Sequence, residues 1–223
     1  QNAGSSPAAP AMGGPISSRI TVRRNKIPAQ VLISLLIDAT GSSRAFALGI
    51  LKTCELILRA IEAAAAEVRC TVHIHRDEEY GEMPCTLIGA GVVTETLDEI
   101  GRIEFRGGGD EFETHASAVL RALDTTAWIA DHRIGHDVMI LMTTSESKLV
   151  DSVDFREIGD RIKNRGILYY HVGEPTPNLQ AITAAACGMT IPLSNNPDAA
   201  ECARVAAKCA ESIRASVSCG ATV

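Results

Sequence analysis

One apolar run that ends in an aspartate constrains the fold of this chain more than any other feature. Residues 31–37 read Val-Leu-Ile-Ser-Leu-Leu-Ile, and Asp38 follows at once. A run of this length, rich in branched aliphatic residues, is typical of a central strand that is buried on both faces of a parallel sheet. Both faces of that sheet must then be covered by helices.

The rest of the chain alternates between helical and strand patterns. Apolar residues recur at helical spacing from Ser42 to about Arg69. We expect further strands at residues 70–76, 86–93, 137–142, 167–172 and 189–193, and further helices around residues 116–123, 155–165, 179–187 and 198–216. The short link after residue 76 predicts a hairpin and therefore one antiparallel strand. The sequence thus predicts an α/β fold, Rossmann-like and doubly wound, with a mostly parallel central sheet, one antiparallel edge strand and helices on both faces.

The ends of the chain differ in composition from its centre. Residues 1–17 are rich in Ala, Gly, Pro and Ser, which is typical of a linker or tail. One domain is expected over residues 18–218, with a short edge strand at residues 19–24 and a tail at residues 219–223. Because the chain begins with Gln1 rather than Met, we expect it to be a fragment or a processed product of a larger polypeptide.

Charge and cysteine usage narrow the choice of partner and compartment. The formal net charge is -6, and no basic run extends beyond residues 23–24, which argues against nucleic acid. No apolar stretch is long enough to span a membrane. Seven cysteines occur without CxxC spacing, and the helical phase of Cys54, Cys202 and Cys209 predicts free, buried thiols. A reducing, cytoplasmic location is expected, with a processed secreted form as the alternative.

Oxygen-bearing side chains follow the central strand in a tight turn. Asp38, Thr40 and Ser42 occupy alternate positions there, and Asp110 and Thr144 are placed in loops after other strands. Because ligands of open parallel sheets bind beyond the carboxyl ends of the strands, we expect these residues on one rim. Carboxylate and hydroxyl oxygens suit Mg²⁺ or another hard cation. The alternative is that Asp38 and the neighbouring serines only cap the next helix.

Three motifs in order resemble those of one family. Residues 38–42, Asp-Ala-Thr-Gly-Ser, resemble the metal-ion-dependent adhesion site of von Willebrand factor A (VWA) domains, Asp-x-Ser-x-Ser, in the form found with α-kinases and in bacterial proteins. Residues 75–77, His-Arg-Asp, resemble the Tyr-Arg-Asp motif of that branch. Residues 107–113 resemble its Gly-Gly-Gly-Asp-x-x-Glu loop, and the likeness extends from Val31 to Val172.

The resemblance implies a divalent cation, Mg²⁺ or else Mn²⁺ or Ca²⁺, held by Asp38, Thr40, Ser42, Asp110 and Thr144. The wider family has a Thr ligand in the loop that contains Asp110 and an Asp where Thr144 stands. The loss of that negative charge should lower the affinity for a divalent cation, and the carboxylate of Asp110 is the candidate that compensates for it. The resemblance further implies that an acidic residue of a partner protein completes the metal coordination. The chain is then a protein-interaction module or scaffold, with a degenerate site that binds partners without metal as the alternative.

Two other functions compete with docking. An aspartyl-phosphate hydrolase of the haloacid dehalogenase type needs a second carboxylate two positions after its aspartate, but Thr40 stands there. A nucleotide-binding Rossmann-like module would place a phosphate at the helix start, where Asp38 repels it. The usual nucleophile, phosphate-loop and zinc-protease motifs are absent from the sequence. We therefore expect no catalytic residue, no organic cofactor and no enzyme.

The histidines near the rim carry a weaker signal. His73 and His75 lie two residues apart in a strand and share a face, as transition-metal ligands would, but no third ligand is obvious from the spacing. His115 follows the glycine-rich loop near the predicted rim. A surface position is the preferred interpretation, and contact with a ligand is the alternative. Arg76 and Asp77 are expected to form a structural pair that fixes the turn after their strand, with a functional role as the alternative.

Overall fold

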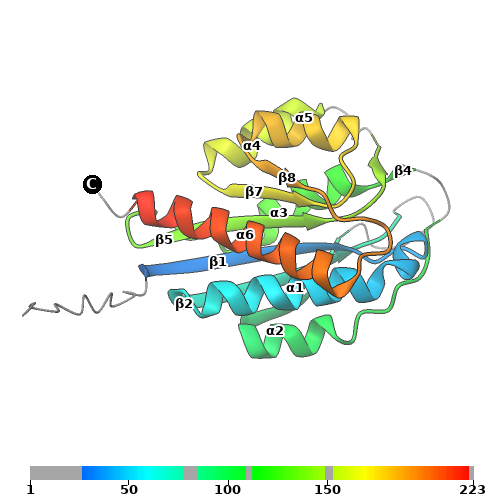
Figure 1. The fold of residues 1–223 in the computed structure, drawn as a ribbon. Coiled ribbons are helices and arrows are strands. Elements are labelled where there is room, and N and C mark those ends of the chain that lie inside the picture. The colour runs from blue at the N-terminus through cyan, green and yellow to red at the C-terminus, as the bar shows by residue number, and fades with distance from the viewer. Residues whose placement is uncertain (1–26, 78–84, 109–111, 149–152, 221–223) are drawn as a thin grey trace, which may run out of the picture.

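A six-stranded sheet forms the centre of the molecule (Figure 1). The computed structural model describes residues 27–77, 85–108, 112–148 and 153–220. The strands lie in the order β3 (Thr86–Val92), β2 (Ala65–His75), β1 (Ile27–Asp38), β5 (Gly135–Met142), β7 (Leu168–Val172) and β8 (Met189–Ile191). Neighbouring strands are parallel except β2 and β3, which are antiparallel. The predicted mostly parallel sheet with one antiparallel edge strand is therefore confirmed.

Helices cover both faces of this sheet, as the sequence predicted (Figure 1). One face carries α1 (Ala47–Glu62), α2 (Val93–Ile100) and α6 (Ala199–Gly220). The other face carries α3 (His115–Thr125), α4 (Phe155–Asn164) and α5 (Pro177–Ala185). A 3-10 turn, η1 (Ser42–Ala45), precedes α1, and two short strands, β4 (Phe112–Glu113) and β6 (Glu146–Ser147), pair in parallel beside the main sheet.

The apolar run predicted as a central strand is β1, which lies between β2 and β5. Ile33, Leu35 and Ile37 pack in one core cluster, while Leu36 packs in the cluster on the opposite face. All four side chains are fully buried. The strand is thus held from both sides, and Asp38 is its last residue.

Some element boundaries differ from the sequence-based prediction. Helix α1 ends at Glu62, and residues 65–69, which were predicted as helix, begin β2. Val68 and Cys70 are buried two positions apart while Arg69 is exposed, which is strand spacing rather than helical spacing. Helix α2 was not predicted, because its eight residues are too few to show a helical repeat. The predicted strand at residues 19–24 and the tail at residues 1–17 lie outside the described residues.

The six cysteines at positions 54, 70, 85, 187, 202 and 209 are free thiols. Cys54, Cys202 and Cys209 are buried, as their helical phase predicted, and Cys187 is exposed. No helix within these ranges combines the length and the apolar character that crossing a bilayer requires.

Candidate metal centre

Three neighbouring elements bring the candidate residues to one rim of the sheet. Asp38 ends β1 and pairs in register with His75, which ends β2. On the other side of β1, Ile37 pairs with Met142, so Thr143 is the first residue beyond β5 at the same level. Because these strands are parallel, their carboxyl ends meet, as expected for a ligand site in such a sheet.

The carboxylate of Asp38 is fully buried and accepts hydrogen bonds from two loops. Its Oδ1 accepts from the backbone N of Thr40 at 3.0 Å and from Thr40 Oγ1 at 2.7 Å. Its Oδ2 accepts from Thr143 Oγ1 at 2.9 Å and from Ser145 Oγ at 3.4 Å. The two carboxylate oxygens therefore face two different sets of groups.

Asp38 is ionised in this environment. Burial by itself raises the pKa of Asp38, but His115, His75 and the two hydrogen bonds from Thr40 outweigh it, so the pKa lies below its ordinary value. Within the described residues no Lys or Arg forms an ion pair with this carboxylate. A buried negative charge thus depends on hydroxyl, amide and imidazole neighbours alone.

Oxygen atoms gather on the Oδ1 side of Asp38. The hydroxyl oxygens of Thr40 and Ser42 lie 2.9 Å apart, and Ser42 Oγ lies 3.5 Å from Glu113 Oε1. Thr40 and Glu113 are buried, whereas Ser42 is exposed. The structure therefore places Asp38, Thr40 and Ser42 together, and it adds Glu113, whose motif was noted in the sequence without a ligand role.

The glycine-rich loop lies directly against this turn. The backbone N of Gly41 donates to Gly107 O at 2.8 Å. Gly108 has a φ of 76°, and a Cβ at this position would lie 3.2 Å from the Cβ of Thr40. The loop can approach Thr40 this closely only because Gly108 has no side chain and tolerates a positive φ. Asp110, predicted as a ligand in the same loop, lies outside the described residues.

The hydroxyl that reaches Asp38 after β5 belongs to Thr143, not to the predicted Thr144. Thr143 is 1% exposed and directs its hydroxyl at Asp38, whereas Thr144 is half-buried. Successive side chains of an extended segment point to opposite sides, so a shift of one residue exchanges the inward and outward positions. Ser145 comes back to the site, with its backbone N donating to Thr143 Oγ1 at 3.2 Å.

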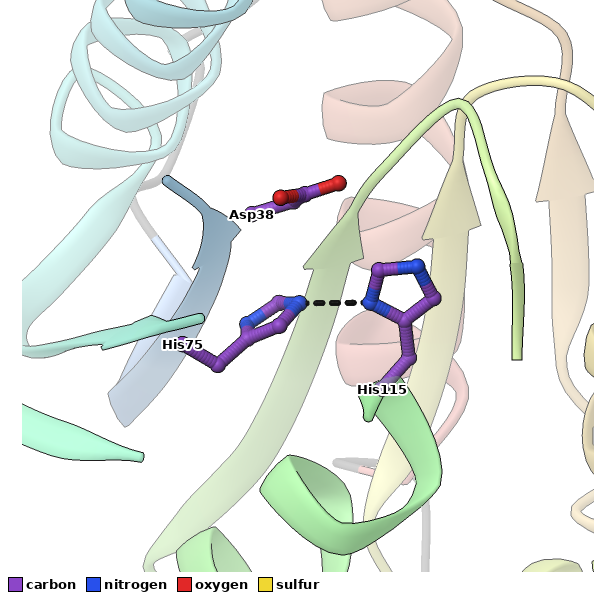
Figure 2. Close-up of side chains that lie close together, drawn as sticks. All are labelled: Asp38, His75 and His115. Carbon is purple, nitrogen blue, oxygen red and sulfur yellow. Dashed lines mark hydrogen bonds between the residues drawn. The ribbon is translucent and has the colours of Figure 1, made fainter. Parts of the chain in front are cut away.

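Two imidazoles lie beside Asp38 (Figure 2). His75 Nε2 lies 2.6 Å from His115 Nδ1, and the rings meet edge to face at 84°. His115 Nε2 lies 2.9 Å from Thr143 Oγ1 and 3.0 Å from Ser145 Oγ. The expectation that His115 lies at the surface is wrong. It is fully buried, because it is the first residue of α3 and that helix begins beneath the rim.

Both imidazoles are neutral near pH 7. Burial, and then the neighbouring His75, lowers the pKa of His115 to about 3. Burial also lowers the pKa of His75, although Asp38 opposes that shift. Neutral imidazoles keep a lone pair on one ring nitrogen, which is the form that binds metal ions.

Asp38, His75 and His115 form a group that could hold a metal ion. One donor atom of each lies within 4.8 Å of the others, and all three residues are buried. Figure 2 shows them approaching one another from β1, β2 and α3. Residue spacing alone did not indicate His115 as a ligand beside His75, because the two residues are 40 positions apart along the chain. His73, its suspected partner, instead lies 3.5 Å from Ser34 Oγ and takes no part in this group.

Asp77 and Arg76 bind groups of the neighbouring loops. Asp77 is buried and forms an ion pair with Lys148 at 3.1 Å. Arg76 Nη2 donates to Glu104 O at 2.7 Å, and the carbonyl of Arg76 accepts from Thr114 Oγ1 at 2.8 Å. These contacts tie the end of β2 to the segments before α3 and after β6, which agrees with the structural role expected for this motif.

Comparisons with known proteins show what the fold is. No protein-family profile matches the sequence, and no curated protein matches it. Among solved structures, the VWA domain of SpRpn10 aligns with a TM-score of 0.63 and 12% identity, over 79% of this chain and 94% of that chain. A von Willebrand factor type A structure from Catenulispora acidiphila aligns with a TM-score of 0.55 and 14% identity, over 86% of this chain and 43% of that chain.

These alignments show that this chain has the fold of VWA domains, which the ordered motifs had predicted. At such low identity the likeness concerns the fold alone. The chain spans less than half of the Catenulispora acidiphila protein, so that protein contains segments with no counterpart here.

Proposed function

We propose that this chain is a protein-interaction module in which a divalent cation on Asp38 docks a carboxylate from a partner protein. One observation carries the proposal: Asp38 is fully buried and ionised without a Lys or Arg counter-ion among the described residues. Buried charges in proteins are paired with an opposite charge or bind metal ions. A cation at this rim would supply the missing positive charge.

The residues on the Oδ1 side suit such an ion. Asp38, Thr40, Ser42 and Glu113 offer carboxylate and hydroxyl oxygens, which are the ligands that Mg²⁺, Mn²⁺ and Ca²⁺ prefer. Hydroxyl ligands are neutral, so a cation held partly by them keeps a positive potential toward the outside. Ser42 is exposed, which marks the side from which a partner's carboxylate would arrive.

The fold supports an interaction role, since one of its structural neighbours is the VWA domain of SpRpn10. We assign no catalytic activity to the chain. An aspartyl-phosphate hydrolase would need an acid at position 40, and Thr40 instead donates its hydroxyl proton to Asp38. A phosphatase assay of the purified chain against Asp38→Asn tests that assignment, and turnover that depends on Asp38 would contradict it.

The docking proposal is tested by comparing the wild-type chain with Asp38→Asn. Asn keeps the shape of the side chain and removes its charge. We expect Mn²⁺ or Mg²⁺ to raise the melting temperature of the wild type but not of Asp38→Asn, and a chelator to release partners captured from native extract. Asp160→Asn, at an exposed position of α4, is the matched control and should behave as the wild type. An equal rise in all three proteins would contradict the proposal.

A further inference from the structure

We propose that the cation at this rim is a transition metal of the zinc class, bound by His75 and His115 together with Asp38. This inference rests on the proposed function in one respect, that Asp38 holds a cation. It adds the kind of metal. It also adds His75 and His115, which are not among the ligands that the adhesion-site motif implies. The group consists of Asp38, His75 and His115 and does not include Thr40 or Ser42.

The chemistry of the donors favours this class of metal. Two neutral imidazoles and one carboxylate bind Zn²⁺, Fe²⁺, Co²⁺ and similar ions, whereas Mg²⁺ and Ca²⁺ take oxygen ligands almost alone. One donor atom each of Asp38, His75 and His115 lies within 4.8 Å of the others, and all three residues are buried. Three donors, one of them charged, leave a dipositive ion with a net positive charge and a free coordination position.

The hydrogen bonds define which nitrogen of His115 is available. Thr143 donates its only hydroxyl proton to Asp38, so at 2.9 Å from His115 Nε2 its oxygen can only accept. His115 therefore carries its proton on Nε2, and the lone pair of Nδ1 points toward His75. Metal-binding histidines typically donate their other ring N–H to a fixed acceptor in this way, which orients the ring. Thr143 performs that task here without touching the metal.

His75 can also present a lone pair toward His115 Nδ1 without a change in its charge. At present His75 Nε2–H donates to His115 Nδ1. Its own Nδ1 is buried and has no hydrogen-bond partner in the described part of the chain. Moving the proton from Nε2 to Nδ1 would leave His75 neutral and free the Nε2 lone pair. Both ring nitrogens would then carry a lone pair in the space beside Asp38, which lies next to the two rings (Figure 2).

The distances require only small movements. Donors bound to zinc at about 2.0–2.1 Å in a tetrahedron lie about 3.3–3.4 Å apart. The two nitrogens, now 2.6 Å apart, would separate by about 0.7 Å from that tetrahedral geometry. The remaining donor atoms, now within 4.8 Å of one another, would close by at most about 1.5 Å by the same geometry. Shifts of this size lie within the reach of side-chain rotation.

The same contacts do not favour Ser145 as a nucleophile. Its hydroxyl lies 3.0 Å from His115 Nε2, as a serine and its general base would. However, it also lies 3.4 Å from the ionised Asp38, which opposes negative charge on the serine oxygen. His115 Nε2 already carries a proton, so it cannot accept the one from Ser145.

The test uses the purified full chain, freed of any tag and stripped with a chelator, and Co²⁺ as a spectroscopic probe. We expect one equivalent of Co²⁺ to give visible d–d absorption without cobalt–thiolate charge-transfer bands, and one equivalent of Zn²⁺ to displace it. X-ray absorption of the zinc-loaded wild type should show two imidazole ligands. Failure of the wild type to bind Co²⁺ and Zn²⁺, or a zinc ion without imidazole ligands, would overturn the inference.

Variants assign the ligands. His75→Gln and His115→Gln should each weaken Zn²⁺ binding by more than about 100-fold, beyond the loss that follows from removing only a supporting group. His132→Gln and Cys187→Ser, which change an exposed imidazole and an exposed thiol, are the matched controls and should bind as the wild type. Circular dichroism of the metal-free variants separates lost binding from lost folding. Undiminished Zn²⁺ binding by folded His75→Gln and His115→Gln would overturn the assignment.

The outcome separates this inference from the proposed function. If Mg²⁺ or Mn²⁺ binds through Asp38 and Zn²⁺ does not, cation-dependent docking stands and the transition-metal site is overturned. If Zn²⁺ binds through both histidines but chelation releases no partner, the metal site stands and docking is overturned. If no divalent cation binds, both are overturned.

Discussion

Thr143 offers the sharpest test of the hydrogen-bond network, because a single hydroxyl joins three parts of the site. It donates to Asp38 Oδ2 at 2.9 Å, and it accepts from His115 Nε2 at 2.9 Å and from the backbone N of Ser145 at 3.2 Å. Thr143→Val replaces the hydroxyl by a methyl group of similar size. The variant therefore removes the three bonds while it preserves the packing.

The expected cost follows from what remains buried after the change. A hydrogen bond to an ionised group contributes about 1.5–3 kcal/mol, and a neutral one about 1 kcal/mol. Asp38 keeps only the longer bond from Ser145 on its Oδ2, and the His115 Nε2–H can turn only to Ser145. We expect the free energy of unfolding to fall by about 3 kcal/mol, which for a chain of this length lowers the melting temperature by about 6–12 °C.

A second buried threonine provides the matched control. Thr53, in α1, is fully buried, and its hydroxyl has no hydrogen-bond partner within the described ranges. Thr53→Val removes an unpaired polar group, so its free energy of unfolding should stay within about 1 kcal/mol of the wild type or rise. Both variants are compared by urea unfolding followed by circular dichroism in chelator. Equal losses for Thr143→Val and Thr53→Val would refute the network described here.

Three further predictions concern the loop, a helix and acid stability. Gly108→Ala, at a positive φ and against Thr40, should lower the free energy of unfolding by about 1–2 kcal/mol in urea titrations. Asp154→Ala removes the cap that accepts from Glu157 N at 2.7 Å and should cost about 1 kcal/mol in the same assay. Burial lowers the pKa of His171 to about 4, below the ordinary 6.5, so the unfolded chain binds the extra proton between these values. The contribution of neutral His171 to the free energy of unfolding should be complete above pH 6.5. It should decline by about 3 kcal/mol as the pH falls to 4. Unfolding measurements across this pH range should show a shallower slope for His171→Gln.

The sequence predicted those features that depend on local patterns. The apolar run before Asp38 identified β1 as a strand with both faces buried, and the alternation of elements predicted the sheet and its antiparallel edge strand. The tight turn brought Thr40 and Ser42 beside Asp38 through bonds that span two residues. Such contacts can be inferred from spacing, because they lie within one turn of the chain.

Features that depend on contacts distant in sequence were missed. His115 and His75 meet only because α3 begins beneath the ends of β1 and β2, and no local pattern encodes that placement. The sequence assigned a ligand role to Thr144, whereas the contact of Thr143 with Asp38 depends on the exact residue at which β5 ends, because a shift of one position reverses the side-chain direction. Strand register could have placed Asp38 beside His75, because these two residues end adjacent parallel strands.

The departures from the adhesion-site motif form a consistent set if the imidazoles bind metal. The Thr143-Thr144 segment lacks the carboxylate that the motif has in its third loop, and this loss weakens the site most for Mg²⁺, which depends on charged oxygen ligands. His75 and His115 add two nitrogen donors beside the remaining carboxylate, and nitrogen donors raise affinity most for the later transition metals. A site that had merely decayed would have no reason to bury two neutral imidazoles against Asp38. On our proposal these changes together replace one class of metal by another at the same rim of the sheet.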